Sequence, residues 1–153
     1  MRAPTLSPLW LLCALACGAP PSEPEPAPEP LAPTPVEPAA LDASWTVGES
    51  GWVAARFSST PEPLPLNAMC ELEVELVAAE GEHAPLEGVE LRASAWMPDH
   101  AHGTNYQPRT TELGGGRYRV RGLLLHMPGY WELFLDVEDG AGGSDRVRYE
   151  VNL

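Results

Sequence analysis

Apolar and polar residues alternate along most of the chain after residue 40. The clearest case is Glu71–Leu76, ELEVEL, in which acidic and aliphatic residues alternate without a break. A period of two is typical of a β-strand that is buried on one face. Extended toward the N-terminus, this parity predicts an inward row of Ala68, Cys70, Leu72, Val74 and Leu76.

Six other segments share this pattern or are rich in strand-forming residues. They span residues 52–57, 89–97, 107–113, 117–125, 128–138 and 146–153. Pro108 lacks an N–H group and favours an edge position for the strand that contains it. Glycine-rich turns separate several of the segments, and no helical periodicity is present. These features predict an all-β fold, a seven-stranded immunoglobulin-like β-sandwich formed by residues 41–153.

Residues 1–16 follow a different pattern, which is typical of a signal peptide. Arg2 precedes an apolar run that ends at Leu15, and this run is too short for a stable membrane anchor. The stretch Ala14–Cys17 resembles the lipobox of bacterial lipoproteins, with a small residue just before the cysteine. The resemblance implies lipid attachment at Cys17, anchorage to a membrane and a location in the cell envelope. Simple secretion with cleavage nearby is the alternative.

A linker is predicted between this signal and the domain, over residues 17–40. Residues 18–40 contain nine prolines, four glutamates and no aromatic residue. Proline fixes its own φ and pushes the preceding residue toward extended conformations. We therefore expect a disordered, polyproline-like spacer, which at about 3.1 Å per residue reaches up to roughly 70 Å.

Cysteine content and charge exclude several functions. After removal of the signal and lipidation of Cys17, only Cys70 is left, so no internal disulfide can form. The inward parity predicts that Cys70 is a small core residue. The formal charge is −13, which disfavours nucleic acid as a partner. All nine basic residues are arginine, so Schiff-base lysine chemistry is excluded.

Two turns carry the candidate chemistry. The first, MPDHAHG, places Met97, His100 and His102 within six residues, and the second, HMPG, contains His126 and Met127. Thioether and imidazole donors together suit copper, especially Cu(I), better than magnesium or calcium. Asp99 could orient a metal-bound imidazole, whereas His83 lies in an acidic loop and is expected to be solvated.

The two turns, with the intervening GRYRV and the following GYW, give the chain a family resemblance. It looks like the YtkA-like domain, related in pattern to FixH-type proteins, from about Trp45 to Val151. The resemblance implies an exported or membrane-anchored immunoglobulin-like domain, and FixH-like relatives are associated with copper delivery to a haem–copper oxidase. The positions that match the family motif are Met97, His100, His102 and Met127. Ala101 replaces a glycine that many members have, and His126 is not clearly part of the motif.

Two functions follow as alternatives. In the first, the chain is a lipid-anchored, non-catalytic copper-binding accessory or chaperone of the cell envelope. In the second, it is a metal-free module that binds another envelope protein, since Met97 and Met127 could also be core residues. An enzyme is disfavoured because the sequence has no nucleophile elbow, phosphate-binding loop or helical zinc motif. A Ser-His-Asp arrangement formed only in space stays possible.

Overall fold

The structure is a computed structural model that describes residues 41–153, and strands make up most of that segment. The expected signal peptide, the lipidation site at Cys17 and the Pro/Glu-rich linker lie outside the described residues. No helix among residues 41–153 has the length and apolar character needed to cross a membrane.

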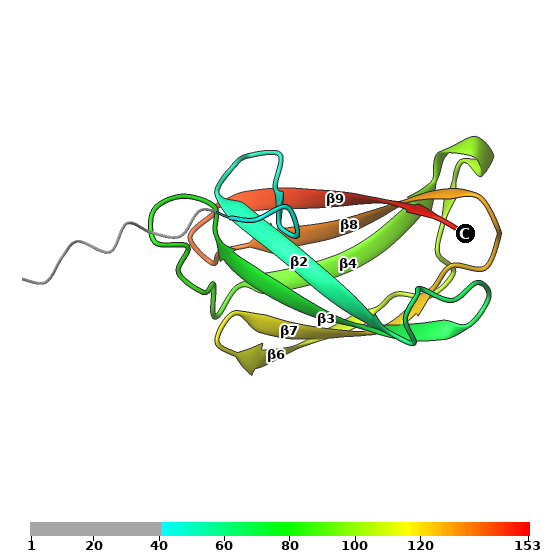
Figure 1. The fold of residues 1–153 in the computed structure, drawn as a ribbon, viewed down its shortest axis with the longest axis horizontal. Coiled ribbons are helices and arrows are strands. Elements are labelled where there is room, and N and C mark those ends of the chain that lie inside the picture. Colours follow the sequence, from blue (N-terminus) through cyan, green and yellow to red (C-terminus); the bar gives the residue numbers. More distant parts are fainter. Residues whose placement is uncertain (1–40) are drawn as a thin grey trace, which may run out of the picture. The chain divides into compact units, whose positions relative to one another are not determined.

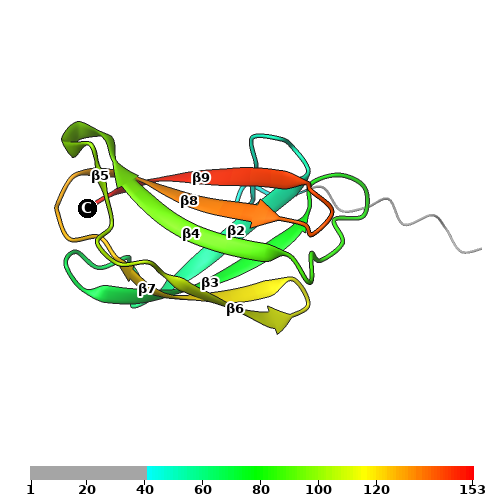
Figure 2. The same cartoon turned by 180° about the vertical axis from the view of Figure 1, so that it is seen from behind.

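Two antiparallel sheets face each other (Figures 1 and 2). The first sheet has the order β1-β2-β3-β7-β6, with bounds Thr46–Val47, Val53–Thr60, Met69–Ala78, Arg117–Leu124 and Arg109–Gly114. The second has the order β5-β4-β8-β9, with bounds His102–Gly103, Glu90–Met97, Tyr130–Glu138 and Ser144–Asn152. The remaining element is a short 3-10 turn, η1, at Pro98–His100.

The seven longer strands confirm the expected sandwich. If these seven strands are numbered along the chain, the first sheet has the order one, two, five, four. The second sheet has the order three, six, seven. This is the strand arrangement of constant-type immunoglobulin domains. β6 is an edge strand, as Pro108 predicted. Within residues 41–153 the structure adds two strands of two residues each, β1 and β5, to the seven expected.

The core forms where the alternation predicted it. Leu72, Val74 and Leu76 are fully buried on β3, and Cys70 beside them is 5% exposed. Burial raises the pKa of the Cys70 thiol, which disfavours the thiolate that would bind a metal. The inward assignment of Ala68 is wrong, because it is exposed and β3 begins only at Met69. The fully buried hydrophobic side chains of the described segment lie between Val53 and Val147, so residues 41–153 carry both sheets and the core between them.

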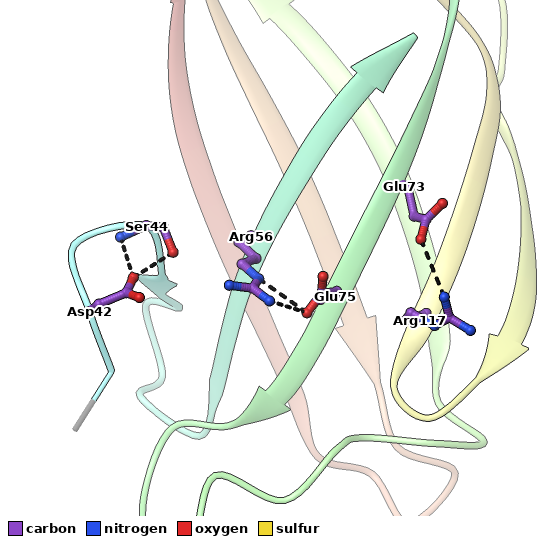
Figure 3. A network of polar contacts seen from close by, with 6 residues as sticks. All are labelled: Asp42, Ser44, Arg56, Glu73, Glu75 and Arg117. Carbon is purple, nitrogen blue, oxygen red and sulfur yellow. Dashed lines mark hydrogen bonds and ion pairs between the residues drawn. The ribbon is translucent and has the colours of Figure 1, made fainter. Parts of the chain in front are cut away.

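Ion pairs cover the outer face of the first sheet, where the parity placed charged residues. Arg56 lies 2.6 Å from Glu75, and Arg117 lies 3.6 Å from Glu73 (Figure 3). Arg119 and Arg121 both pair with Glu71, at 2.8 and 2.6 Å. These pairs are partly exposed, so solvent screens the attraction between the charges. They balance the charge of this face and add little to stability.

The two candidate turns lie at the same end of the sandwich (Figures 1 and 2). After η1 the chain folds back, so that β5 pairs with β4 and Met97 stands opposite His102. The loop between β7 and β8 carries His126 and ends at Gly129, whose backbone exchanges two hydrogen bonds with Leu153, at 2.8 and 3.1 Å. Backbone hydrogen bonds therefore hold both turns in place.

Candidate metal centre

His102 presents one ring nitrogen for coordination. Its side chain is half-buried on β5, and Nδ1 lies 3.0 Å from the carbonyl oxygen of Gly103. A carbonyl only accepts hydrogen bonds, so in the neutral ring this contact holds the proton on Nδ1. Nε2 then carries the lone pair and is the nitrogen through which His102 would bind a metal.

His126 lies directly against His102, although the sequence motif did not include it. The two rings are stacked, with centroids 5.1 Å apart and planes inclined by 29°. Nδ1 of His126 is buried and has no hydrogen-bond partner among the described residues. A buried polar atom without a partner costs about 1–3 kcal/mol, and a bond to a metal ion would remove that cost. The sequence signal was a lone polar residue inside the apolar run LLLHMP.

Trp131 forms one wall of the histidine pair. Its indole is fully buried on β8 and meets both rings edge-on, with centroids 5.7 Å from His102 and 5.6 Å from His126. The indole Nε1–H donates a hydrogen bond of 2.9 Å to the carbonyl oxygen of Met127. The wall is therefore fixed both by the core and by the loop that carries His126.

Met97 is a core residue that adjoins the pair. It is 2% exposed, as its inward parity indicated, and it stands opposite His102 in the β4–β5 pairing. Paired residues in an antiparallel sheet project to the same face, so its thioether and the His102 ring share the inner side. A Cβ atom placed on Gly129 would lie only 2.8 Å from Cε of Met97. The absence of a side chain at position 129 thus leaves room for the thioether.

Met127 is a packing residue at the end of the sandwich. Its side chain is half-buried and packs against the hydrophobic core, and its carbonyl oxygen holds Trp131. This agrees with the interpretation of Met127 as a residue that closes the core. Of the two methionines proposed as ligands, Met97 is the one whose strand pairs with a histidine.

His100 stands outside the pair. It is exposed at the end of η1, and its ring centroid lies 5.9 Å from that of His102. The backbone between the two histidines is not extended, because Pro98–His100 form a 3-10 turn and Ala101 is left-handed, with φ 50° and ψ 43°. The tight turn, and not strand alternation, brings the two imidazoles near each other.

Asp99 and His83 both differ from what the sequence suggested. Asp99 is exposed and makes no hydrogen bond to a histidine within residues 41–153, while the carbonyl of Gly103 takes the orienting role that Asp99 was expected to have. His83 is half-buried and its Nδ1 lies 3.1 Å from the carbonyl oxygen of Ala78, so the expectation of a solvated side chain is wrong.

The ring spacings are compatible with a shared ion. Because metal–imidazole bonds are about 2.0–2.1 Å long, two rings on one ion have centroids roughly 4.5 to 6.5 Å apart. The 5.1 and 5.9 Å spacings around His102 fall within this range. No three His, Cys, Asp or Glu side chains of residues 41–153 are already arranged around a metal position. The donor types suit copper, and binding requires side-chain rotations that bring the donor atoms together.

A groove runs along the outer surface behind this site. Trp96 and Gly103 are paired, and they alternate with the inward Met97 and His102 on the same two strands. The groove has a volume of about 590 Å³, and its lining includes Trp96, Tyr106 and Phe134. Trp96 is 40% exposed and Tyr106 is 53% exposed. Aromatic side chains are thus presented to solvent on the reverse side of the strands that carry the candidate ligands.

Comparison with known proteins leaves the family unassigned. No family model matches the chain, and no curated protein matches it either. The YtkA-like resemblance therefore stays a prediction. Among solved structures, a copper-bound glutamate-to-glutamine variant of FetP from uropathogenic Escherichia coli is similar at 15% identity. The match covers 66% of this chain and 85% of that chain, with a TM-score of 0.41.

Proposed function

We propose that this chain is an exported, lipid-anchored protein of the cell envelope that binds and passes on copper without catalysing a reaction. The observation that carries the proposal is the buried Nδ1 of His126, which has no partner among residues 41–153, in a ring stacked against that of His102. The contact of His102 Nδ1 with Gly103 leaves the lone pair of the His102 ring on Nε2. The histidine pair adjoins the buried thioether of Met97. This description corresponds to the accessory or chaperone role that the YtkA-like resemblance implies.

The donor chemistry favours Cu(I) as the cargo. Thioether sulfur is a soft ligand that selects Cu(I), and imidazole binds copper in either oxidation state. His102 and His126 are half-buried and His100 is exposed, so the donors run from the interior to the surface at one end of the domain. An ion held there can be reached from outside, as release to a partner protein of the envelope requires.

The rest of the proposal depends on the N-terminal sequence. Lipid at Cys17 would hold the protein on a membrane, and residues 18–40 would space the domain from it. The formal charge of −13 argues against nucleic acid as a partner. The Pro/Glu-rich composition and the small residue before Cys17 support this arrangement.

A competition titration tests the copper proposal. A fragment of residues 41–153, checked for cooperative melting, is titrated with Cu(I) against a chromophoric chelator. We expect one ion per chain and a loss of affinity of at least 100-fold when His102 and His126 are both replaced by alanine. Met97→Leu should weaken binding more than Met127→Leu, because both changes roughly conserve volume and only Met97 is paired with a histidine. Equal affinity of the fragment and the double variant would refute the proposal.

The aromatic groove favours a second function, a metal-free module that binds another envelope protein. Exposed tryptophan and tyrosine are enriched in protein interfaces, and Trp96 and Tyr106 line the same groove. One substitution distinguishes the two functions. Trp96→Ala should leave Cu(I) affinity unchanged if copper is the cargo, and it should abolish partner capture if the groove is the working surface.

A further inference from the structure

We propose that His100 is the exchange ligand of the copper site, which takes up the incoming ion and later yields its place to a donor from the partner. This inference rests on the proposed function and deepens it. The holding ligands would be His102, His126 and Met97, which lie closer to the core. Affinity and exchange rate would then depend on different residues of the same site.

The surroundings of the three imidazoles fit a division into two holding ligands, His102 and His126, and one exchange ligand, His100. His102 is held by its contact with Gly103 and by two neighbouring rings, and His126 contacts both His102 and Trp131. His100 is exposed, and its ring nitrogens make no hydrogen bond among residues 41–153. Its ring contact is with His102, at 5.9 Å between centroids. The His100 side chain is therefore free to rotate, while the other two rings are confined.

The backbone beneath His100 is fixed although its side chain is free. Pro98 restricts φ at the start of η1, and the N–H of Ala101 donates a hydrogen bond of 3.2 Å to the carbonyl oxygen of Pro98. Ala101 then turns the chain back into β5. The imidazole of His100 thus moves by side-chain rotation from a constant position beside His102, without rearrangement of the strands.

The coordination chemistry explains why such a ligand is useful. Two imidazoles and one thioether give Cu(I) three bonds and leave one side open toward solvent. On uptake, the bond from His100 to copper forms as a bond to the donor molecule breaks. On release, a thioether, imidazole or thiolate of the partner displaces His100 first. The copper stays in the same oxidation state throughout, so no oxidant or reductant is needed.

The test separates the rate of copper transfer from the affinity for copper. The full chain in detergent carries Cys13→Ser and Cys17→Ser in all variants, so that the terminal thiols do not bind copper. Cu(I) transfer to excess bicinchoninate is followed by stopped-flow absorbance, and affinity is measured by equilibrium competition. We expect His100→Ala to slow transfer at least tenfold and to change affinity less than threefold, whereas His102→Ala lowers affinity at least 100-fold.

Three controls make the result specific. His83→Ala removes an imidazole whose Nδ1 contacts the carbonyl of Ala78, and it should change neither quantity. His100→Met supplies another copper ligand and should restore part of the transfer rate, whereas His100→Phe should not. An unchanged rate in His100→Ala overturns the inference, and so does a loss of affinity equal to that of His102→Ala. A parent protein that binds no Cu(I) refutes the proposed function itself, which is a distinct result.

Discussion

The imidazole of His126 stacks on that of His102, although one belongs to the loop before β8 and the other to β5. Both rings meet the same buried indole, that of Trp131. Three polar aromatic rings at the end of a hydrophobic core are costly unless their nitrogens find partners, and Nδ1 of His126 has none among residues 41–153. In this account, copper is the missing partner.

Replacing His126 should raise the stability of the metal-free protein and lower its affinity for Cu(I). His126→Leu removes a buried polar atom without a partner and keeps an apolar side chain of similar size. We expect the metal-free protein to gain about 1–3 kcal/mol in its free energy of unfolding. Cu(I) affinity should fall at least tenfold in the same variant. Urea denaturation and chelator competition measure the two effects, and a destabilised variant that keeps full affinity would contradict the account.

Copper binding should quench the fluorescence of Trp131, because its indole contacts both histidines. Trp96 is a matched control, since it lies on the neighbouring strand β4 but is exposed on the outer face. We expect Trp131→Phe to remove most of the quenching amplitude and Trp96→Phe to leave it nearly unchanged. If the loss follows Trp96 instead, copper binds on the groove side of the sheet.

Gly129 is expected to position the thioether of Met97. Gly129→Ala introduces a Cβ 2.8 Å from Cε of Met97, at a position whose φ of +126° also disfavours alanine. Gly122→Ala is the control, because it shares a positive φ, +89°, and would meet no atom within 4 Å. Both changes should destabilise by about 1–3 kcal/mol through the backbone. Only Gly129→Ala should also weaken Cu(I) binding, as measured by competition.

Tyr149 gives the fold a defined sensitivity to alkaline pH. Burial raises the pKa of Tyr149 to about 12, and its hydroxyl donates a hydrogen bond of 2.6 Å to the carbonyl oxygen of Ala55. The unfolded chain loses this proton near its ordinary pKa of about 10, so the folded state binds more protons between the two values. Its contribution is complete below pH 10 and is lost as pH rises toward 12.

The corresponding measurement is the free energy of unfolding in urea between pH 8 and 12. Tyr149→Phe should cost about 1 kcal/mol near neutral pH and should flatten the decline above pH 10. Tyr118 and Tyr130 also have pKa values raised by burial, so part of the decline is expected to persist. An identical decline in Tyr149→Phe and the parent protein would contradict this assignment.

The fold was predictable from the sequence because its signal is local. The period of two in ELEVEL and in residues 89–97 indicates which side chains face inward. Leu72, Val74 and Met97 are buried in the structure, as this period predicted. The error at Ala68 arose because parity alone does not say where a strand begins. β1 and β5 were missed because two residues are too few to show any period.

The candidate site was only partly predictable, because its geometry depends on contacts between distant segments. The motif suggested His100 and His102 as a pair, yet the stacked partner of His102 is His126. That contact requires the loop before β8 to lie over β5, which no local pattern encodes. Met97 had two competing interpretations, and it is both a buried core residue and the strand partner of His102.

X-ray absorption at the copper edge tests the central claim most directly, namely that His102, His126 and Met97 share one ion. In the Cu(I)-loaded 41–153 fragment, we expect imidazole nitrogens at about 2.0 Å together with one longer sulfur shell. Met97→Leu should remove the sulfur shell, and His126→Leu should remove one imidazole. A spectrum that contains no sulfur shell, or one that neither substitution changes, would contradict the account.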